Sequence, residues 1–64
     1  MRRYKVRHVV ALLYKDGWII DRIIGDHRQF RNKTKPGTVT VRGKMNEDLS
    51  QFILNSIWKQ AGWK

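Results

Sequence analysis

Residues 18–42 read WIIDRIIGDHRQFRNKTKPGTVTVR and contain the main signals for the architecture of this chain. The first segment of this stretch is rich in β-branched and aromatic residues, and its last segment alternates with the period of a strand. Two turn signals, the pair Gly25-Asp26 and the Thr-Lys-Pro-Gly run at 34–37, divide the stretch into three parts. Because both turns are short, the parts should form an antiparallel meander. The predicted strands are 18–24, 27–33 and 38–42.

A helix is predicted on each side of this meander, because apolar residues there recur at the spacing of one helical face. The first helix ends near Asp16-Gly17, where glycine can take the left-handed conformation that ends helices. The second runs from about Leu49 to Gly62, and its start is left open among three capping residues, Asn46, Asp48 and Ser50. The predicted buried faces comprise Val6, Val9, Val10 and Leu13 in the first helix, and Ile53, Leu54, Ile57, Trp58 and Ala61 in the second.

The order helix-strand-strand-strand-helix predicts an α+β fold in which two helices cover one face of a three-stranded antiparallel sheet. The chain has 64 residues, and a chain of that size, which buries only about 60% of its unfolded surface, forms one domain. We therefore expect a single domain over residues 1–64. The role of Trp63 is left open among packing on the core, stacking on a base and contacting a partner. Four large residues are expected in the core: Trp18, Phe30, Leu54 and Trp58.

The alternation of side chains along a strand predicts what each face of the sheet carries. If Phe30 packs toward the helices, Arg28 and Asn32 share its side. The first strand is apolar on both sides, so its orientation stays open, although Ile23 and Ile24 cannot both be buried by the same helices. Exposed β-branched residues on this edge favour pairing with another chain, which suggests a protein partner there. The open face should carry His27, Gln29, Arg31, Thr38, Thr40 and Arg42.

Fourteen Lys and Arg residues against five Asp and Glu residues give a net charge of +9, which favours a polyanionic partner. Charge alone is also compatible with a ribosomal or DNA-coating protein. The chain has no cysteine, and its two histidines are far apart without an acidic cluster, so we expect neither disulfides nor a metal site. No apolar run approaches the roughly 20 residues of a membrane span, and no signal peptide is recognisable, so we expect a cytoplasmic protein without membrane contact.

His27 is the strongest candidate for a catalytic residue, because an imidazole with an ordinary pKa of about 6.5 can accept and donate a proton near neutral pH. From the residues alone, a surface histidine beside a turn is the simpler interpretation. Basic side chains near such a histidine can hold a phosphate of a polyanionic partner. Four basic residues near His27 in the predicted sheet are candidates for that role: Arg28, Arg31, Arg42 and Lys44.

Four short motifs, in consistent order over nearly the whole chain, carry a family likeness. They are Asp16-Gly17-Trp18, Gly25-x-His27-x-x-Phe30, Lys35-Pro36-Gly37-Thr38-Val39-Thr40-Val41 and Ile57-Trp58-Lys59-Gln60-Ala61-Gly62. With these motifs, the chain resembles the HicA-type mRNA interferase toxins. The glycine-histidine turn combined with the final Lys-Gln-Ala-Gly is more specific than any single motif.

This resemblance implies a double-stranded-RNA-binding-domain-like fold, and cleavage of mRNA without a metal, a cofactor or the ribosome. It implies that His27 is catalytic and that Gly25 and Phe30 are structural positions of the motif. It also implies neutralisation by a HicB-type antitoxin, which we expect to be acidic and to form a hetero-oligomer with this chain. Asp26 replaces the small residue, commonly serine, that the family has before the histidine.

A non-catalytic RNA-binding module, or a degenerate and inactive toxin, is the alternative, because the chain departs from the family pattern at Asp26 and at residues 42–44. This alternative predicts salt-sensitive RNA binding without cleavage. A helix-based DNA-binding protein is disfavoured, because neither predicted helix belongs to a short helix-turn-helix unit.

Overall fold

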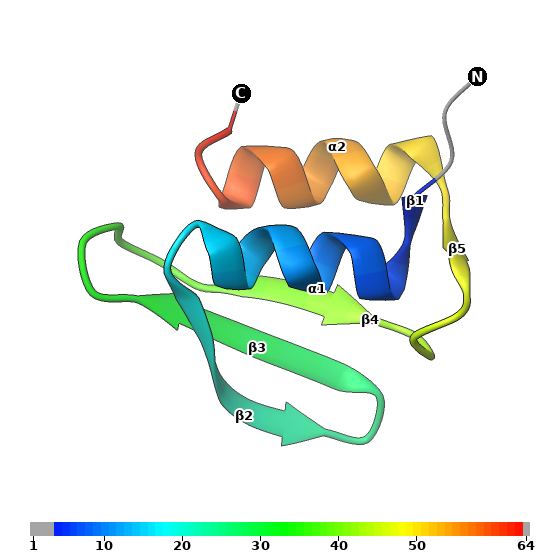
Figure 1. The fold of residues 1–64 in the computed structure, drawn as a ribbon, viewed down its shortest axis with the longest axis horizontal. Helices are drawn as coiled ribbons and strands as arrows, with labels where there is room; N and C mark the ends of the chain where they lie inside the picture. Colours follow the sequence, from blue (N-terminus) through cyan, green and yellow to red (C-terminus); the bar gives the residue numbers. More distant parts are fainter. Residues whose placement is uncertain (1–3, 64) are drawn as a thin grey trace.

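The computed structural model describes residues 4–63. Its elements are β1 (Tyr4–Lys5), α1 (Val6–Lys15), β2 (Trp18–Ile24), β3 (His27–Asn32), β4 (Val39–Arg42), β5 (Asp48–Leu49) and α2 (Gln51–Gln60). Strands β2, β3 and β4 form an antiparallel sheet in that order, and β1 pairs with β5 (Figure 1). The predicted α+β fold with its three-stranded meander and two helices is confirmed, and the β1–β5 pair is an addition to it.

The core lies between the two helices and one face of the β2–β3–β4 sheet. All four apolar residues predicted for the inner face of α1 are buried, and so are four inward residues of the strands, Trp18, Phe30, Val39 and Val41. Trp58 and Ile53, also predicted for the core, are partly buried and pack at its edge. The buried set is Val6, Val9, Val10, Leu13, Trp18, Phe30, Val39, Val41, Leu54, Ile57 and Ala61.

The start of α2 differs from the sequence prediction. Leu49 belongs to β5, where it pairs with Tyr4, so the helix begins at Gln51 rather than near Leu49. Ser50 is the residue that caps it, since its Oγ accepts a hydrogen bond from the backbone N–H of Ile53 at 3.2 Å. Two-residue strands carry no periodicity, which is why β1 and β5 were not predicted.

A β-bulge at Asp21 determines on which face of the sheet each side chain of β2 stands. Ile20 pairs with Phe30 and Arg22 pairs with Gln29, so Asp21 is the extra residue on the β2 side. One extra residue reverses the side on which the following residues stand. Arg22 therefore stands on the same face as Gln29. The expectation that Ile23 and Ile24 are not both buried is confirmed, because both are more than half exposed.

Helix α2 runs along the outer edge of β4. There the backbone N–H of Thr40 donates a hydrogen bond of 2.9 Å to Oε1 of Gln60. The Gln60 amide in turn donates to Oγ of Ser56 at 3.0 Å. These bonds fix α2 against the sheet and occupy a backbone donor that an edge strand would otherwise leave free.

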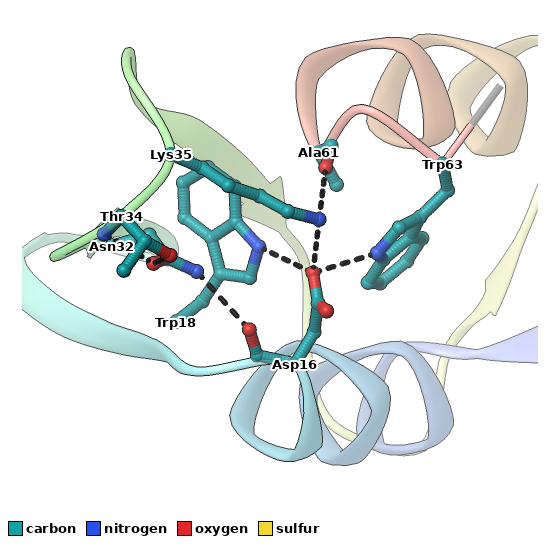
Figure 2. A network of polar contacts seen from close by, with 7 residues as sticks. All are labelled: Asp16, Trp18, Asn32, Thr34, Lys35, Ala61 and Trp63. Atoms are coloured by element: carbon teal, nitrogen blue, oxygen red, sulfur yellow. Dashed lines mark hydrogen bonds and ion pairs between the residues drawn. The ribbon is translucent and has the colours of Figure 1, made fainter.

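The carboxylate of Asp16 binds three side chains near the end of the sheet at which β2 begins (Figure 2). Its Oδ2 accepts hydrogen bonds from Nζ of Lys35 at 2.7 Å, Nε1 of Trp63 at 2.8 Å and Nε1 of Trp18 at 3.1 Å. The bond from Lys35, followed by that from Trp63, holds the pKa of Asp16 below its ordinary value of 3.8. We call Asp16, Trp18, Lys35 and Trp63 the Asp16 cluster.

Trp63, a member of this cluster, is also held by contacts with the end of α2. Gly62 has φ of +73°, and the backbone N–H of Trp63 donates to the carbonyl of Trp58 at 2.9 Å, which is the pattern of a Schellman motif. The indole rings of Trp58 and Trp63 meet edge to face, with their centroids 5.0 Å apart. Of the roles left open for Trp63, packing on the core is therefore the one observed.

Candidate active site

His27 is the first residue of β3 and follows a two-residue turn. Ile24 and His27 are cross-strand partners, so the loop between them is Gly25-Asp26. Gly25 has φ of +60°, a positive value that the first loop residue of a type II′ turn requires and that glycine adopts without steric cost. Gly25 therefore sets the point at which β3 begins and, with it, the face on which His27 stands.

The sheet register surrounds His27 with basic side chains on the open face. Arg42 is directly opposite His27 in β4, and Arg31 lies four residues along β3 on the same face. Directly opposed residues of neighbouring strands share a face, so Arg22 joins them through its pairing with Gln29. Within residues 4–63, the side chains of Arg31 and Arg42 have no hydrogen-bond or ion-pair partner. Their positive charge is therefore free to meet a ligand.

Arg22 is the residue of this set that sequence reasoning missed. Its side depends on the bulge at Asp21, and no turn or spacing signal in residues 18–24 indicates a bulge. Its guanidinium Nε lies 3.7 Å from a carboxylate oxygen of the neighbouring Asp21, and both side chains are largely exposed. Exposed pairs of this kind are weak, so Arg22 remains available as a cation.

Two hollows open beside His27, and we call them together the His27 groove. Their volumes are about 450 and 390 Å³, within the range of small-molecule sites. His27, Arg42 and Ile53 line both hollows. The first is completed by Asp26, Gly43, Glu47, Asp48, Leu49 and Ser50, and the second by Gln29, Thr40, Ser56, Ile57 and Gln60.

The carboxylate of Asp26 lies close to the imidazole of His27 but forms no hydrogen bond with it. Nε2 of the imidazole lies 3.8 Å from Oδ1 of Asp26, and the two side chains are 40% and 64% exposed, respectively. This distance is too long for a hydrogen bond. The ring is therefore reachable from solvent.

Arg28 lies on the face opposite His27. It pairs with the buried Val41, and its Nη1 donates a hydrogen bond of 2.6 Å to the carbonyl of Gly43. The backbone N–H of Gly43 donates to the carbonyl of Asp26 at 3.2 Å. Arg28 thus ties the loop after β4 to the turn before His27, and its role as an RNA contact stays a prediction.

Lys44 is exposed in the loop that follows β4, one residue after Gly43, and lines neither hollow. Gly43 is close to Glu47, since a Cβ added there would lie 2.9 Å from Oε2 of Glu47, and its φ is +102°. A side chain at position 43 would therefore disturb this loop. Lys44 remains a candidate for contacts outside the groove.

No group of three or more His, Cys, Asp or Glu side chains suited to a metal ion occurs within residues 4–63. In the same part of the chain, neither helix has the length and apolar character needed to cross a membrane.

Comparison with known proteins identifies the family of the chain. The model of the family described as "HicA toxin of bacterial toxin-antitoxin" matches residues 6–63, which is almost all of the chain. A comparison with curated proteins finds no significant match. The matched segment includes His27, both hollows beside it and the Asp16 cluster. The chain therefore belongs to the HicA toxin family of bacterial toxin–antitoxin systems.

Proposed function

We propose that this toxin is an endoribonuclease that cleaves mRNA and uses His27 as its single catalytic histidine. The observation that carries the proposal is the position of His27, a solvent-reachable imidazole between two hollows and directly opposite an unpaired arginine. Acid–base chemistry at a phosphodiester needs these two groups together: one to move a proton and one to stabilise the charged phosphate.

In the proposed reaction, the neutral imidazole of His27 takes the proton of a ribose 2′-hydroxyl. The 2′-oxygen then forms a bond to the adjacent phosphorus, and the bond from phosphorus to the 5′-oxygen breaks. The leaving 5′-oxygen takes a proton from water, and the products carry a 2′,3′-cyclic phosphate and a 5′-hydroxyl. Arg42 stabilises the charge that builds on the phosphate, and Arg22 and Arg31 bind neighbouring phosphates.

The proposed partner is a HicB-type antitoxin with an acidic surface that covers the His27 groove. The net charge of +9 supports this complementarity, because opposite charges speed and orient association. Toxin and antitoxin would form a hetero-oligomer, and mRNA as substrate implies action in the cytoplasm. Undiminished RNA cleavage at saturating antitoxin would contradict this assignment.

The experiment is incubation of purified wild-type, His27→Ala and His8→Ala protein with a defined mRNA in EDTA, followed by mapping of the fragment ends. His8 is the matched control, since it is an exposed histidine of α1 that lines neither hollow. We expect cleavage by wild type and His8→Ala, with 2′,3′-cyclic phosphate ends, and cleavage at least about a hundredfold slower by His27→Ala.

Cleavage by His27→Ala at the wild-type rate would refute the catalytic assignment. Binding of the mRNA by all three proteins without cleavage would instead favour the non-catalytic RNA-binding module.

A further inference from the structure

The residues shared by the two hollows mark the boundary between them. His27 and Arg42, the proposed proton acceptor and phosphate ligand, both belong to this boundary. A phosphate held there would have one hollow on each side. In a nucleic acid chain, the groups on either side of a phosphate are two successive nucleosides.

The first hollow is unsuited to a second phosphate. Carboxylates of Asp26 and Glu47 line it, and they would repel a phosphate but accept hydrogen bonds from the amino group of a base. Leu49 and Ile53 add apolar surface to the same hollow. Its chemistry therefore fits a nucleobase rather than the backbone.

Apart from His27 and Arg42 at the boundary, the second hollow is lined by neutral side chains, four of which can form hydrogen bonds. Gln29 and Thr40 face it from the sheet, while Ser56 and Gln60 face it from α2. Within residues 4–63 the Gln29 side chain has no hydrogen-bond partner, so its amide can both donate to and accept from a base edge. The bonds from Thr40 to Gln60 and from Gln60 to Ser56 hold the α2 wall in place, which lowers the cost of ordering the site on binding.

The proposed reaction requires a particular conformation of the RNA backbone at the bond that is cleaved. The attacking 2′-oxygen must lie in line with the bond from phosphorus to the 5′-oxygen. The stacked A-form duplex holds the 2′-oxygen away from that line, whereas two unstacked nucleotides can reach it. Splayed bases of this kind are characteristic of single-stranded RNA recognition.

We propose that the His27 groove binds two successive nucleotides of single-stranded RNA, one base in each hollow, with the phosphate between them at His27 and Arg42. This inference rests on the proposed endoribonuclease function and adds the strandedness of its substrate and the place of each base. Gln29 is the proposed reader of the base in the second hollow.

The test measures binding of labelled RNA by fluorescence anisotropy, using full-length His27→Ala protein so that cleavage does not interfere. We expect single-stranded RNA to bind at least about tenfold more tightly than the same sequence annealed to its complement, because only the single strand can place bases in the hollows. An abasic oligonucleotide of equal length and charge should also bind at least about tenfold more weakly.

A blocking variant locates the site. Ser56→Trp, added to His27→Ala, fills the second hollow and should weaken binding of the single strand by at least about tenfold, the loss expected for one base contact. Asn55→Trp in the same background is the matched control, since Asn55 is an exposed neighbour on α2 that lines neither hollow. It should bind as His27→Ala does, and thermal unfolding checks that both variants fold.

Equal binding of duplex and single strand, or of abasic and normal RNA, would overturn the groove proposal even if wild-type protein cleaves mRNA. Normal binding by a folded Ser56→Trp variant would overturn it as well. If wild type cleaves nothing while the predicted binding pattern holds, the groove assignment stands and the catalytic proposal fails.

Discussion

The two ends of the β2–β3 pair use polar groups in opposite ways. At the end where Trp18 pairs with Asn32, the Asp16 carboxylate accepts three hydrogen bonds from segments far apart in the sequence. At the other end, His27 and Arg42 face solvent, and Arg42 has no partner within residues 4–63. Satisfied polar groups hold segments together, whereas unsatisfied ones are available to a ligand. We therefore assign a stabilising role to the Asp16 end and propose that the His27 end is the functional one.

The largest effect on stability should come from Phe30→Ala. The ring is fully buried and meets Tyr14 edge to face with centroids 5.8 Å apart. Its removal should lower the free energy of unfolding by about 3–5 kcal/mol, most of what a domain of this size has. Urea unfolding measures this change. His27→Ala, three residues away on the open face, should change the free energy of unfolding by less than about 0.5 kcal/mol. A comparable loss in both variants would contradict the division of roles.

The second prediction concerns Asp16→Asn and pH. The folded protein lowers the pKa of Asp16, so the unfolded chain binds more protons below the ordinary value of 3.8. The charged carboxylate therefore stabilises the fold above that pH, and its contribution is lost as the pH falls through the lowered pKa. Asp16→Asn should be less stable than wild type at neutral pH, and the difference should shrink below pH 3.8. Urea midpoints across this range measure it, and a constant difference would argue against the charged cluster.

Arg28→Ala and Arg42→Ala compare a paired and an unpaired arginine on opposite faces of one sheet. Arg28→Ala removes the bond to the Gly43 carbonyl and should cost about 1 kcal/mol of unfolding free energy. Arg42→Ala should cost less than about 0.5 kcal/mol. In RNA binding, Arg42→Ala should reduce the slope of log affinity against log salt by about 1. An unchanged slope would remove Arg42 from the phosphate site.

The smallest effect is expected for Phe52→Ser. This ring is 80% exposed on the first turn of α2 and lines neither hollow. The substitution should leave the free energy of unfolding within about 0.5 kcal/mol of wild type, as measured by urea unfolding, and RNA affinity unchanged. A marked loss of affinity would extend the interface beyond the His27 groove.

Local patterns in the sequence predicted most of the fold. The spacing of Val6, Val9 and Leu13 predicted α1, and alternation around Phe30 predicted the face on which His27 stands. Both depend on residues near in sequence, and both are confirmed.

What the sequence did not predict depends on contacts between distant segments or on single-residue irregularities. The Asp16 cluster joins the end of α1 to Lys35 and Trp63, and no periodicity links these positions. The bulge at Asp21 is one residue long, yet it decides that Arg22 stands on the open face. The position of His27, Arg31 and Arg42 on the open face was therefore predicted. The position of Arg22 and the groove wall formed by α2 were not predicted, and the functional roles of these residues stay a proposal.

The most direct test of the central claim is the rate at which His27→Ala cleaves mRNA compared with wild type, under conditions where both proteins are folded. A general base contributes about 10²–10⁴-fold to a rate, so we expect the rate to fall by at least about a hundredfold without a change in the unfolding midpoint. A variant that is folded and cleaves at the wild-type rate would show that the His27 groove is not the active site.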